Sequence, residues 1–432
     1  MERKIAKKLQ DWKNNPRRKP LIVSGARQVG KTYSALTFGR ENYKNTVYFS
    51  LEDSREVGAI FDRDLNPERI IRELSANCGQ SIFPEDTLII FDEIQACERA
   101  LTSLKYFCEN APEYHIIAAG SLLGVAMNRE QYSFPVGKVD MLTLYPLDFE
   151  EFLMATGNNP LAMLIKESYA DFLPLSLHDT AMDLYKTYLV VGGMPQAVLD
   201  YISTKDFNFV LAAQKNINDA YIADMAKYAT PQETTKIMAA WASIPAQLSK
   251  ENHKFQYKVI KSGARAYEYE TPLDWLKFAG IIHKCTRVKE GKMPLVAYAD
   301  NESFKVYMMD TGLLCSKFGI AANVILNSHT MFDGFKGALT ENYICQSLVT
   351  NGFVPFYWSS PGKAELDFVF QDTAGNIIPL EGKSADNVRA KSLKQYMSLY
   401  KPEYAIRVSA KNFGFEGGIK SIPLYALFCL TP

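Results

Sequence analysis

One stretch near the start of the chain has the residue types and spacing of a phosphate-binding loop. It reads Gly25-Ala26-Arg27-Gln28-Val29-Gly30-Lys31-Thr32, matches GxxxxGK[ST] and directly follows an apolar run. The glycines let the backbone curl so that its N–H groups and the next helix's N-terminus face the β- and γ-phosphates of a nucleotide. Lys31 would reach phosphate oxygens, and the Thr32 hydroxyl would bind Mg²⁺. We therefore predict a nucleotide site at residues 25–32.

Two adjacent acids end a later apolar run, TLIIFDE, at Asp92 and Glu93. Asp92 fits a partner of the Mg²⁺ ion together with Thr32, and Glu93 fits the base that polarises a hydrolytic water. The next apolar run, HIIAAG, leads to Ser121, which has two interpretations: it senses the γ-phosphate, or it caps a helix. The pattern predicts nucleotide hydrolysis with Lys31 and Glu93 as the catalytic residues.

A second set of acids lies in the last hundred residues. Period-two spacing puts Glu381 and Lys383 on one face of a strand, and a hairpin can bring Asp367 beside them. Glu341, on the helix before, completes the cluster. Such acids can hold one or two Mg²⁺ ions, and a nearby lysine can position or deprotonate water for phosphodiester cleavage. The alternative is a fold used for packing or binding, whose acids are remnants or solvated charges.

A basic segment lies between these two sets. Its cations, opposed only by Glu251 over sixteen residues and interleaved with aromatics, are Lys250, Lys254, Lys258, Lys261 and Arg265. If residues 265–278 form the second helix of a helix-turn-helix, its start can enter a major groove of DNA while the lysines contact phosphates. A solvated basic face is the alternative. Asp310, in the sequence Asp-Thr-Gly, is expected to cap a helix.

Three kinds of region must position these residues. In the first, apolar runs of the kind that is covered on both faces predict a parallel α/β sheet: 21–24, 46–51, 87–93, 114–120 and 139–147. The second region shows helical periodicity that is broken at Gly192-Gly193. After this break the sequence predicts two further helices and a hairpin, and these suggest a winged-helix-like module. The end returns to mixed α/β, with 404–409 as the last strand. We predict domains at 1–157, 158–330 and 331–432.

Several motifs resemble the bacterial and archaeal AAA-type P-loop ATPase family. They are PLIVSGARQVGKT, LIIFDEIQ, AAGS and LYPLDFEEFL, and in the family's C-terminal domain of unknown function GGMPQAV and KVYMMDTGLL. The resemblance implies ATP rather than GTP, a five-stranded AAA-like core and sites usually completed between subunits. Family members commonly have Gly-Arg where this chain has Gly137-Lys138, and lysine lacks the planar fork of an arginine finger. Arg129 is a nearby substitute. Because Lys138 does not establish a site shared between subunits, monomer and ring both stay open.

The C-terminal order of helix, strand, hairpin and helix is similar to the PD-(D/E)xK nuclease superfamily. That resemblance assigns the acid, the Asp and the ExK of a possible nuclease site to Glu341, Asp367, Glu381 and Lys383. It implies an α/β restriction-endonuclease-like domain after the helical middle. Fold by itself does not settle function.

The net charge of the chain excludes few function classes, because 48 Lys and Arg balance 48 Asp and Glu. The charges balance over the whole chain but not within its regions: residues 1–20 hold eight Lys/Arg and two Asp/Glu, and residues 41–157 hold nine Lys/Arg and twenty Asp/Glu. Local DNA contact is therefore compatible with neutrality. Scattered cysteines, a charged start and the absence of a long apolar run predict a cytoplasmic protein without membrane contact.

The leading hypothesis is a Mg²⁺-dependent ATPase whose nucleotide state controls a C-terminal winged-helix and nuclease-like module acting on DNA. The alternative is an ATP-controlled interaction switch with an inactive nuclease-like domain. A small-molecule kinase is disfavoured, because Asp92 and Glu93 suit water activation better than transfer to an acceptor. Candidate partners are ATP, DNA, a second copy of the chain and a partner protein.

Overall fold

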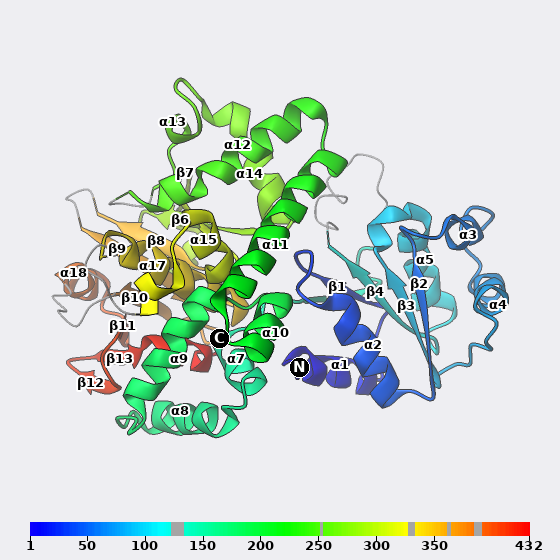
Figure 1. The fold of residues 1–432 in the computed structure, drawn as a ribbon, viewed down its shortest axis with the longest axis horizontal. Helices are drawn as coiled ribbons and strands as arrows, with labels where there is room; N and C mark the ends of the chain where they lie inside the picture. Colours follow the sequence, from blue (N-terminus) through cyan, green and yellow to red (C-terminus); the bar gives the residue numbers. More distant parts are fainter. Residues whose placement is uncertain (122–133, 251–253, 327–332, 361–363, 384–390) are drawn as a thin grey trace. The chain divides into compact units, whose positions relative to one another are not determined.

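A computed structural model describes the chain except for residues 122–133, 251–253, 327–332, 361–363 and 384–390. It contains two compact units (Figure 1). Unit 1 comprises Met1–Tyr145 and Phe278–Gly280, and unit 2 comprises Pro146–Lys277 and Ile281–Pro432. The three domain ranges expected from the sequence stay a prediction. None of the helices in the described ranges is long and apolar enough to cross a membrane.

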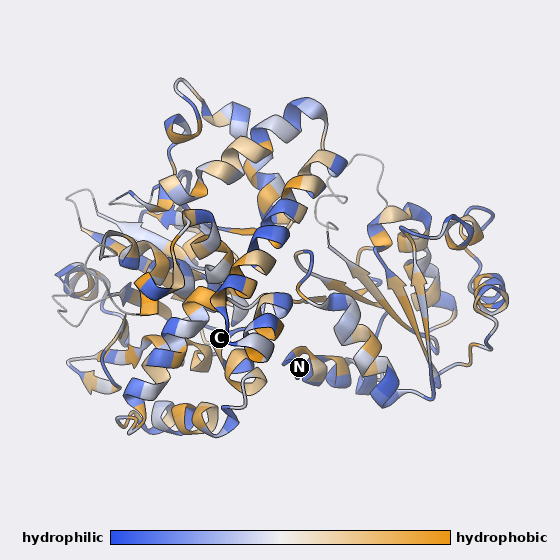
Figure 2. Ribbon diagram, in the orientation of Figure 1, coloured by the Kyte–Doolittle hydropathy of each residue, from blue (hydrophilic) through white to orange (hydrophobic). Residues whose placement is uncertain are grey.

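Unit 1 is built on a parallel five-stranded sheet with the order β2-β3-β4-β1-β5. Its strands are β1 (Leu21–Ser24), β2 (Asn45–Ser50), β3 (Thr87–Asp92), β4 (His115–Gly120) and β5 (Asp140–Thr143). All five apolar runs therefore form strands, as predicted. The last strand, β5, ends at Thr143, before the end of its predicted run. Figure 2 shows the hydrophobic colour of the sheet's central strands, which agrees with a sheet covered on both faces.

Helices cover both faces of this sheet. They are α1 (Ile5–Asn14), α2 (Lys31–Asn42), α3 (Arg55–Ile60), α4 (Pro67–Cys78), the 3₁₀ turn η1 (Ile94–Ala96) and α5 (Glu98–Asn110). Ile89 and Phe91 of β3 belong to one apolar core with α3, α4 and α5. Leu88 points the other way, toward Gly39 of α2, where a Cβ would lie 3.1 Å from the Leu88 side chain. This alternation follows from the two-residue period of a strand.

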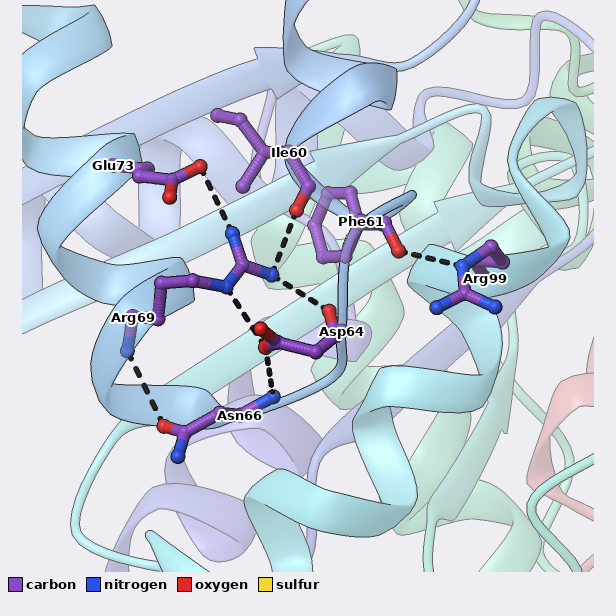
Figure 3. Close-up of polar contacts among 7 residues, drawn as sticks. All are labelled: Ile60, Phe61, Asp64, Asn66, Arg69, Glu73 and Arg99. Atoms are coloured by element: carbon purple, nitrogen blue, oxygen red, sulfur yellow. Dashed lines mark hydrogen bonds and ion pairs between the residues drawn. The ribbon is translucent and has the colours of Figure 1, made fainter.

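Two acids of unit 1, Asp64 and Glu73, take part in the structural contacts of one buried arginine. Arg69, which is buried, donates to the carbonyls of Ile60 (2.9 Å) and Asp64 (2.6 Å) and to the Asp64 carboxylate (2.8 Å), and it pairs with Glu73 (Figure 3). Its hydrogen bond holds the pKa of Asp64 below the usual range. Arg99 donates to the carbonyl of Phe61 at 2.6 Å. These bonds shape the connection between α3 and α4.

Unit 2 begins with a run of helices. These are α7 (Phe149–Ala155), α8 (Asn159–Asp171), α9 (His178–Val191), α10 (Pro195–Thr204), α11 (Phe207–Tyr228), α12 (Pro231–Leu248), α13 (Tyr257–Ile260) and α14 (Ala266–Phe278). The break between α9 and α10 falls at Gly192-Gly193, as predicted. Helix α12 starts at Pro231, directly after Thr230, which forms a capping box with Glu233.

Unit 2 also contains an eight-stranded sheet, in which the strand order is β12-β13-β11-β10-β9-β8-β6-β7. The strands are β6 (Ile282–Val288), β7 (Ala299–Met308), β8 (Phe356–Ser359), β9 (Glu365–Gln371), β10 (Ile377–Gly382), β11 (Ala405–Ser409), β12 (Gly414–Glu416) and β13 (Ile419–Pro423). The other elements are η2 (Leu295–Tyr298), α15 (Thr311–Phe318), α16 (Ala322–Leu326), α17 (Asp333–Thr350), α18 (Lys391–Tyr400) and η4 (Leu424–Cys429).

Two sequence expectations are corrected here. The hairpin β6–β7 forms, but it is not confined to a separate middle module, because β6 also pairs in parallel with β8. The strand 404–409 is not the last: β13 pairs with β11, and β12 pairs with β13. Both β12 and β13 are short, and only pairing within the sheet specifies such segments.

Two distant motifs of unit 2 meet at one buried carboxylate. Asp310 is fully buried, caps α15 by accepting from Leu313 N (2.9 Å), and accepts from Gly193 N (2.6 Å). The predicted cap is thus confirmed. Burial raises the pKa of Asp310 to about 6. A Cβ at Gly192 would lie 2.3 Å from Asp310 Oδ1, and one at Gly193 would lie 2.0 Å from Leu147 O, so both positions require glycine.

We predict that Gly193→Ala destabilises unit 2 by more than about 2 kcal/mol, because the new methyl group overlaps a backbone carbonyl. Thermal unfolding followed by circular dichroism measures the effect. Gly337→Ala is the matched control: this helical glycine of α17 has no atom within 4 Å of a built Cβ, so the substitution should be neutral or stabilise by up to about 1 kcal/mol. Equal melting temperatures for the two variants would contradict the prediction.

Candidate nucleotide site and acidic cluster

The predicted phosphate loop connects β1 to α2. Gly25 has a φ of 143°, Gln28 of 66°, and Gly30, which precedes α2, of 96°. A Cβ at Gly25 would lie 2.2 Å from Leu144 O. Glycine is therefore needed at position 25 both for its backbone angle and for space. The curled loop leads into the start of a helix, whose first N–H groups have no partner within the helix.

Lys31 is buried, and its ammonium donates to the loop's own carbonyls, Gly25 O at 2.9 Å and Ala26 O at 2.8 Å. Among the other predicted loop residues, Val29 is buried, Arg27 is half-buried and Gln28 is exposed. The loop thus presents a cation and backbone donors at the carboxyl end of β1. This combination suits a polyphosphate.

Thr32 and Asp92 meet as the sequence predicts. Thr32 Oγ1 donates to Asp92 Oδ2 at 2.8 Å, and Tyr48 OH donates to the same oxygen at 2.9 Å. Burial and then the nearby Asp92 charge raise the pKa of Tyr48. A hydroxyl beside a carboxylate is a donor set that fits Mg²⁺, which keeps several waters and takes one or two carboxylates plus phosphate oxygens. Thr32 and Asp92 are the residues that would hold the ion.

Glu93 begins the turn η1, and two side chains orient its carboxylate. Ser121 Oγ donates to Glu93 Oε2 at 3.0 Å, and Gln95 Nε2 donates to the same oxygen. Ser121 therefore contacts the predicted base, and its sensing of the γ-phosphate stays a prediction. The other interpretation of Ser121, as a helix cap, concerns residues 122–133, which lie outside the described residues. Arg129 also lies outside them. Lys138, which stands where the resemblance leads one to expect an arginine, pairs with Glu109 at 2.9 Å.

Arg3 supports this site although its sequence context gave no sign of it. The residue is buried, and its guanidinium donates to Val29 O (3.0 Å) and to Tyr145 O (2.7 Å). It therefore joins the phosphate loop to the end of unit 1. Arg3 is one of eight cations in residues 1–20, and the sequence does not show which of these side chains are buried and which are solvated. Tyr48 was missed because its strand reads only as an apolar run, and Gln95 because no motif specifies its role.

The C-terminal acids lie around β7, β9, β10 and α17. Glu341 accepts from Tyr307 OH (2.8 Å), Asp367 accepts from Gly382 N (2.8 Å), and Lys383 pairs with Glu381 (2.8 Å). Burial and then the charge of Glu341 raise the pKa of Asp367 to about 7. The predicted residues are thus brought into one neighbourhood. Among the described residues, however, no three His, Cys, Asp or Glu side chains are grouped so that they could hold a metal ion.

Three further residues take part in this acidic cluster. Lys305 of β7 pairs with Glu341 (3.3 Å) and Glu365 (3.0 Å), and Lys254 also pairs with Glu365 (3.0 Å). Burial lowers the pKa of Lys305, but the charges of Glu341, Glu365 and Asp367 outweigh this and raise it above the usual value. Lys305 was missed because it lies in KVYMM, an apolar strand pattern far along the chain from the acids.

The basic segment is only partly available for a partner. Lys254 is paired as above, and Lys250 Nζ donates to Gln256 Oε1 at 2.8 Å. Lys258, Lys261 and Arg265 are exposed. The turn that carries them borders a cavity of about 680 Å³ between α12 and the start of α14. Three of the five predicted cations thus remain on the surface.

Comparisons with known proteins agree with this geometry for unit 1. Residues 17–153 match the family model of the AAA domain. This part of the chain contains the parallel sheet and the glycine loop described above, so it is similar to that domain in sequence and in fold. Two further matches are to domains of unknown function, DUF8612 over residues 182–323 and DUF4143 over residues 336–427. No curated protein matches the chain.

Among solved structures, the Walker-type ATPase PABY2304 of Pyrococcus abyssi is 15% identical with a TM-score of 0.45, and the match covers 73% of this chain and 95% of that one. The Aeropyrum pernix ORC2 protein, in ADPNP–ADP complexes, is 13% identical with a TM-score of 0.36 (75% and 91% covered). AMPPCP-bound DnaA from Aquifex aeolicus is 14% identical with a TM-score of 0.28 (63% and 86% covered).

We predict that Arg3→Met weakens binding of an ATP analogue and destabilises unit 1 by about 1–3 kcal/mol, because Val29 O and Tyr145 O lose their donor. Analogue titration and thermal unfolding measure the two effects. Lys7→Met, which removes an exposed cation of α1 four residues further along the chain, is the control and should behave as the parent protein. If Arg3→Met changes neither property, Arg3 does not support the loop.

We also predict that Ser121→Ala lowers ATP turnover about tenfold, or about 1.4 kcal/mol, with little change in nucleotide affinity, since only the orientation of Glu93 is affected. Steady-state phosphate release gives kcat and KM separately. The matched control is Ser103→Ala, whose buried hydroxyl donates to Ala100 O in α5 and should leave turnover unchanged. A rise in KM at constant kcat would instead assign Ser121 to binding.

Proposed function

We propose that this protein binds ATP with Mg²⁺, hydrolyses it, and uses its nucleotide state to control unit 2, which acts on DNA. The observation that carries the ATPase proposal is the pair of contacts behind the glycine loop. Thr32 is hydrogen-bonded to Asp92 at 2.8 Å, and Ser121 to Glu93 at 3.0 Å. One pair suits an ion, and the other suits an oriented base.

Each residue has a chemical role in this proposal. The loop N–H groups and Lys31 hold the phosphates. Thr32 and Asp92 would hold Mg²⁺, which would neutralise charge on the phosphate oxygens when bound. Glu93 accepts a proton from the attacking water. The water oxygen bonds to the γ-phosphorus, the bond to the β,γ-bridging oxygen breaks, and ADP and phosphate leave. Ser121 keeps the Glu93 carboxylate oriented during this step.

Control of unit 2 is supported by the segment that leaves unit 1. In unit 1, Leu144 N donates to Ser24 O at 2.8 Å, directly before the loop, and Arg3 joins Tyr145 to Val29. In unit 2, Leu147 N donates to Gly193 O at 2.7 Å. A shift of the loop on phosphate binding would therefore reach the first residues of unit 2 through the covalent chain.

Action on DNA is supported by the exposed cations Lys258, Lys261 and Arg265. Helix α14 itself carries Glu268, Glu270 and Asp274. We therefore propose that the turn before α14, rather than the body of the helix, contacts phosphates. Contacts of this kind position a protein on DNA without reading its sequence.

A second candidate function is an ATP-controlled interaction switch with a catalytically inactive nuclease-like domain. It is favoured by one specific observation, the burial of Lys305 between Glu341 and Glu365. In this candidate the acids serve structure, and ATP binding rather than cleavage of nucleic acid produces the output.

We predict that Lys31→Ala abolishes ATP hydrolysis, because the phosphates lose their cation, and that Glu93→Gln still binds ATP but turns it over at least about a hundredfold more slowly. Phosphate release and binding of a fluorescent ATP analogue measure the two properties. Lys105→Ala, an exposed lysine of α5, is the control for loss of a charge. Unchanged turnover in either test variant would refute the ATPase proposal.

We predict that the triple variant Lys258→Gln, Lys261→Gln, Arg265→Gln weakens DNA binding at least about tenfold and reduces its salt dependence, since phosphate contacts release counterions. Fluorescence anisotropy with a labelled duplex at several salt concentrations measures both.

A second experiment distinguishes the two candidate functions: plasmid and linear DNA are incubated with Mg²⁺ or Mn²⁺ and either the parent protein or the Asp367→Ala variant. Metal-dependent cutting that Asp367→Ala abolishes supports the nuclease, whereas binding without cutting supports the switch.

A further inference from the structure

Lys305 is the buried cation of the acidic cluster. It lies on β7 and is 1% exposed. Its ammonium pairs with Glu341 Oε2 at 3.3 Å and Glu365 Oε1 at 3.0 Å, and it lies 5.2 Å from the centre of the Tyr357 ring. An ammonium so far from water is stable only when carboxylates surround it. Here two elements of unit 2, α17 and β9, supply those carboxylates.

The position of Glu341 over β7 is fixed by its neighbour. Asn342, fully buried, accepts from Met308 N at 2.7 Å and donates to Met308 O at 3.1 Å. These two bonds hold α17 on the edge of the sheet. Glu341 is thereby held beside Lys305 and Tyr307, both of which donate to its Oε2.

The acids of the cluster already have nitrogen or oxygen donors. Glu341 and Glu365 are paired as described, Lys254 also pairs with Glu365, and Lys383 pairs with Glu381. Within the described part of the chain, Glu381 Oε2 differs from the other oxygens of these carboxylates, because it is buried without a hydrogen-bond partner. A divalent ion would have to displace ammonium groups from most of its ligands.

Charge counting leads to the same conclusion. The acids are Glu341, Glu365, Asp367 and Glu381, and the lysines are Lys254, Lys305 and Lys383. The formal deficit is therefore one positive charge. Without Lys305 it would be two, the charge of one divalent cation. Lys305 thus supplies charge that a metal ion supplies in a metal-dependent site.

We propose that the ammonium of Lys305 is the resident cation of this acidic cluster and that the cluster binds no divalent metal ion. The set Glu341, Asp367, Glu381 and Lys383 that resembles a nuclease site does not fit a metal, because Lys305 neutralises Glu341. The unit then acts on a partner by binding rather than by cutting phosphodiesters. This inference goes beyond the ATPase function and does not depend on it.

The first test is a Mn²⁺ titration of the full-length, nucleotide-free protein, followed by electron paramagnetic resonance. We expect no ion bound at the cluster. Binding that is lost in Glu381→Gln or Asp367→Asn overturns the proposal, because Glu381 Oε2 would then be a ligand. Binding that survives both substitutions lies outside the cluster and agrees with it. ATP hydrolysis is not measured here, so failure of this inference is distinguishable from failure of the ATPase proposal.

The second test asks whether a metal replaces the missing charge. We expect Lys305→Ala to melt about 5 °C lower in EDTA and to recover most of this loss in millimolar Mn²⁺, while the parent protein does not respond to Mn²⁺. Lys317→Ala is the matched control: this lysine is half-buried over the Trp241 ring, 4.3 Å from its centre, so the variant should not recover. No recovery in Lys305→Ala overturns the proposal.

If Lys305→Ala does not fold, Lys305→Met and the double variant with Glu341→Gln replace it. Removing both charges of the pair should restore stability relative to Lys305→Met alone, because no carboxylate is left facing an apolar side chain. A double variant that melts no higher than Lys305→Met would mean that Lys305 does not neutralise Glu341, and would overturn the proposal.

Discussion

The close approach of Gly25 to the carbonyl of Leu144 is the constraint on which the nucleotide site depends. It exists because β1 lies between β4 and β5 in the parallel sheet, so the phosphate loop and the exit from unit 1 start from adjacent strand ends. Glycine at 25 allows this contact, and Arg3 reinforces it by bonding to Val29 and Tyr145. The residues that hold phosphate and the residues that lead to unit 2 are therefore neighbours, which gives nucleotide binding a short route to the rest of the chain.

Unit 2 contains charged side chains that are buried and therefore need partners within the protein. Asp310 is satisfied by backbone N–H groups, including that of Gly193, so two motifs far apart in the sequence form one structural feature. The acidic cluster is satisfied instead by lysines, above all Lys305. Removing one partner from such a set leaves an uncompensated charge. Both arrangements tie helices to one another or to the sheet, and both explain conspicuous polar residues without assigning them to catalysis.

The two units thus differ in how their polar residues relate to chemistry. In unit 1, Lys31, Thr32, Asp92 and Glu93 lie at the carboxyl ends of strands, where parallel sheets commonly bind ligands. In unit 2, Glu341, Glu365 and Lys305 lie within the fold and neutralise one another. A nuclease-like order of residues therefore does not by itself imply a nuclease.

The sequence by itself determined the apolar strands of unit 1, the glycine loop, the acids at the end of β3 and the cap at Asp310. These features depend on local spacing, and a parallel sheet brings its strand ends together without further information. Only the tertiary structure decided the role of Arg3, the partner of Ser121, the extension of the β6–β7 hairpin into a larger sheet, and the ion pairs of Lys305. Each depends on which distant segments pack together. A buried lysine and a solvated one are the same letter in the sequence, and the surrounding carboxylates that distinguish them come from α17 and β9.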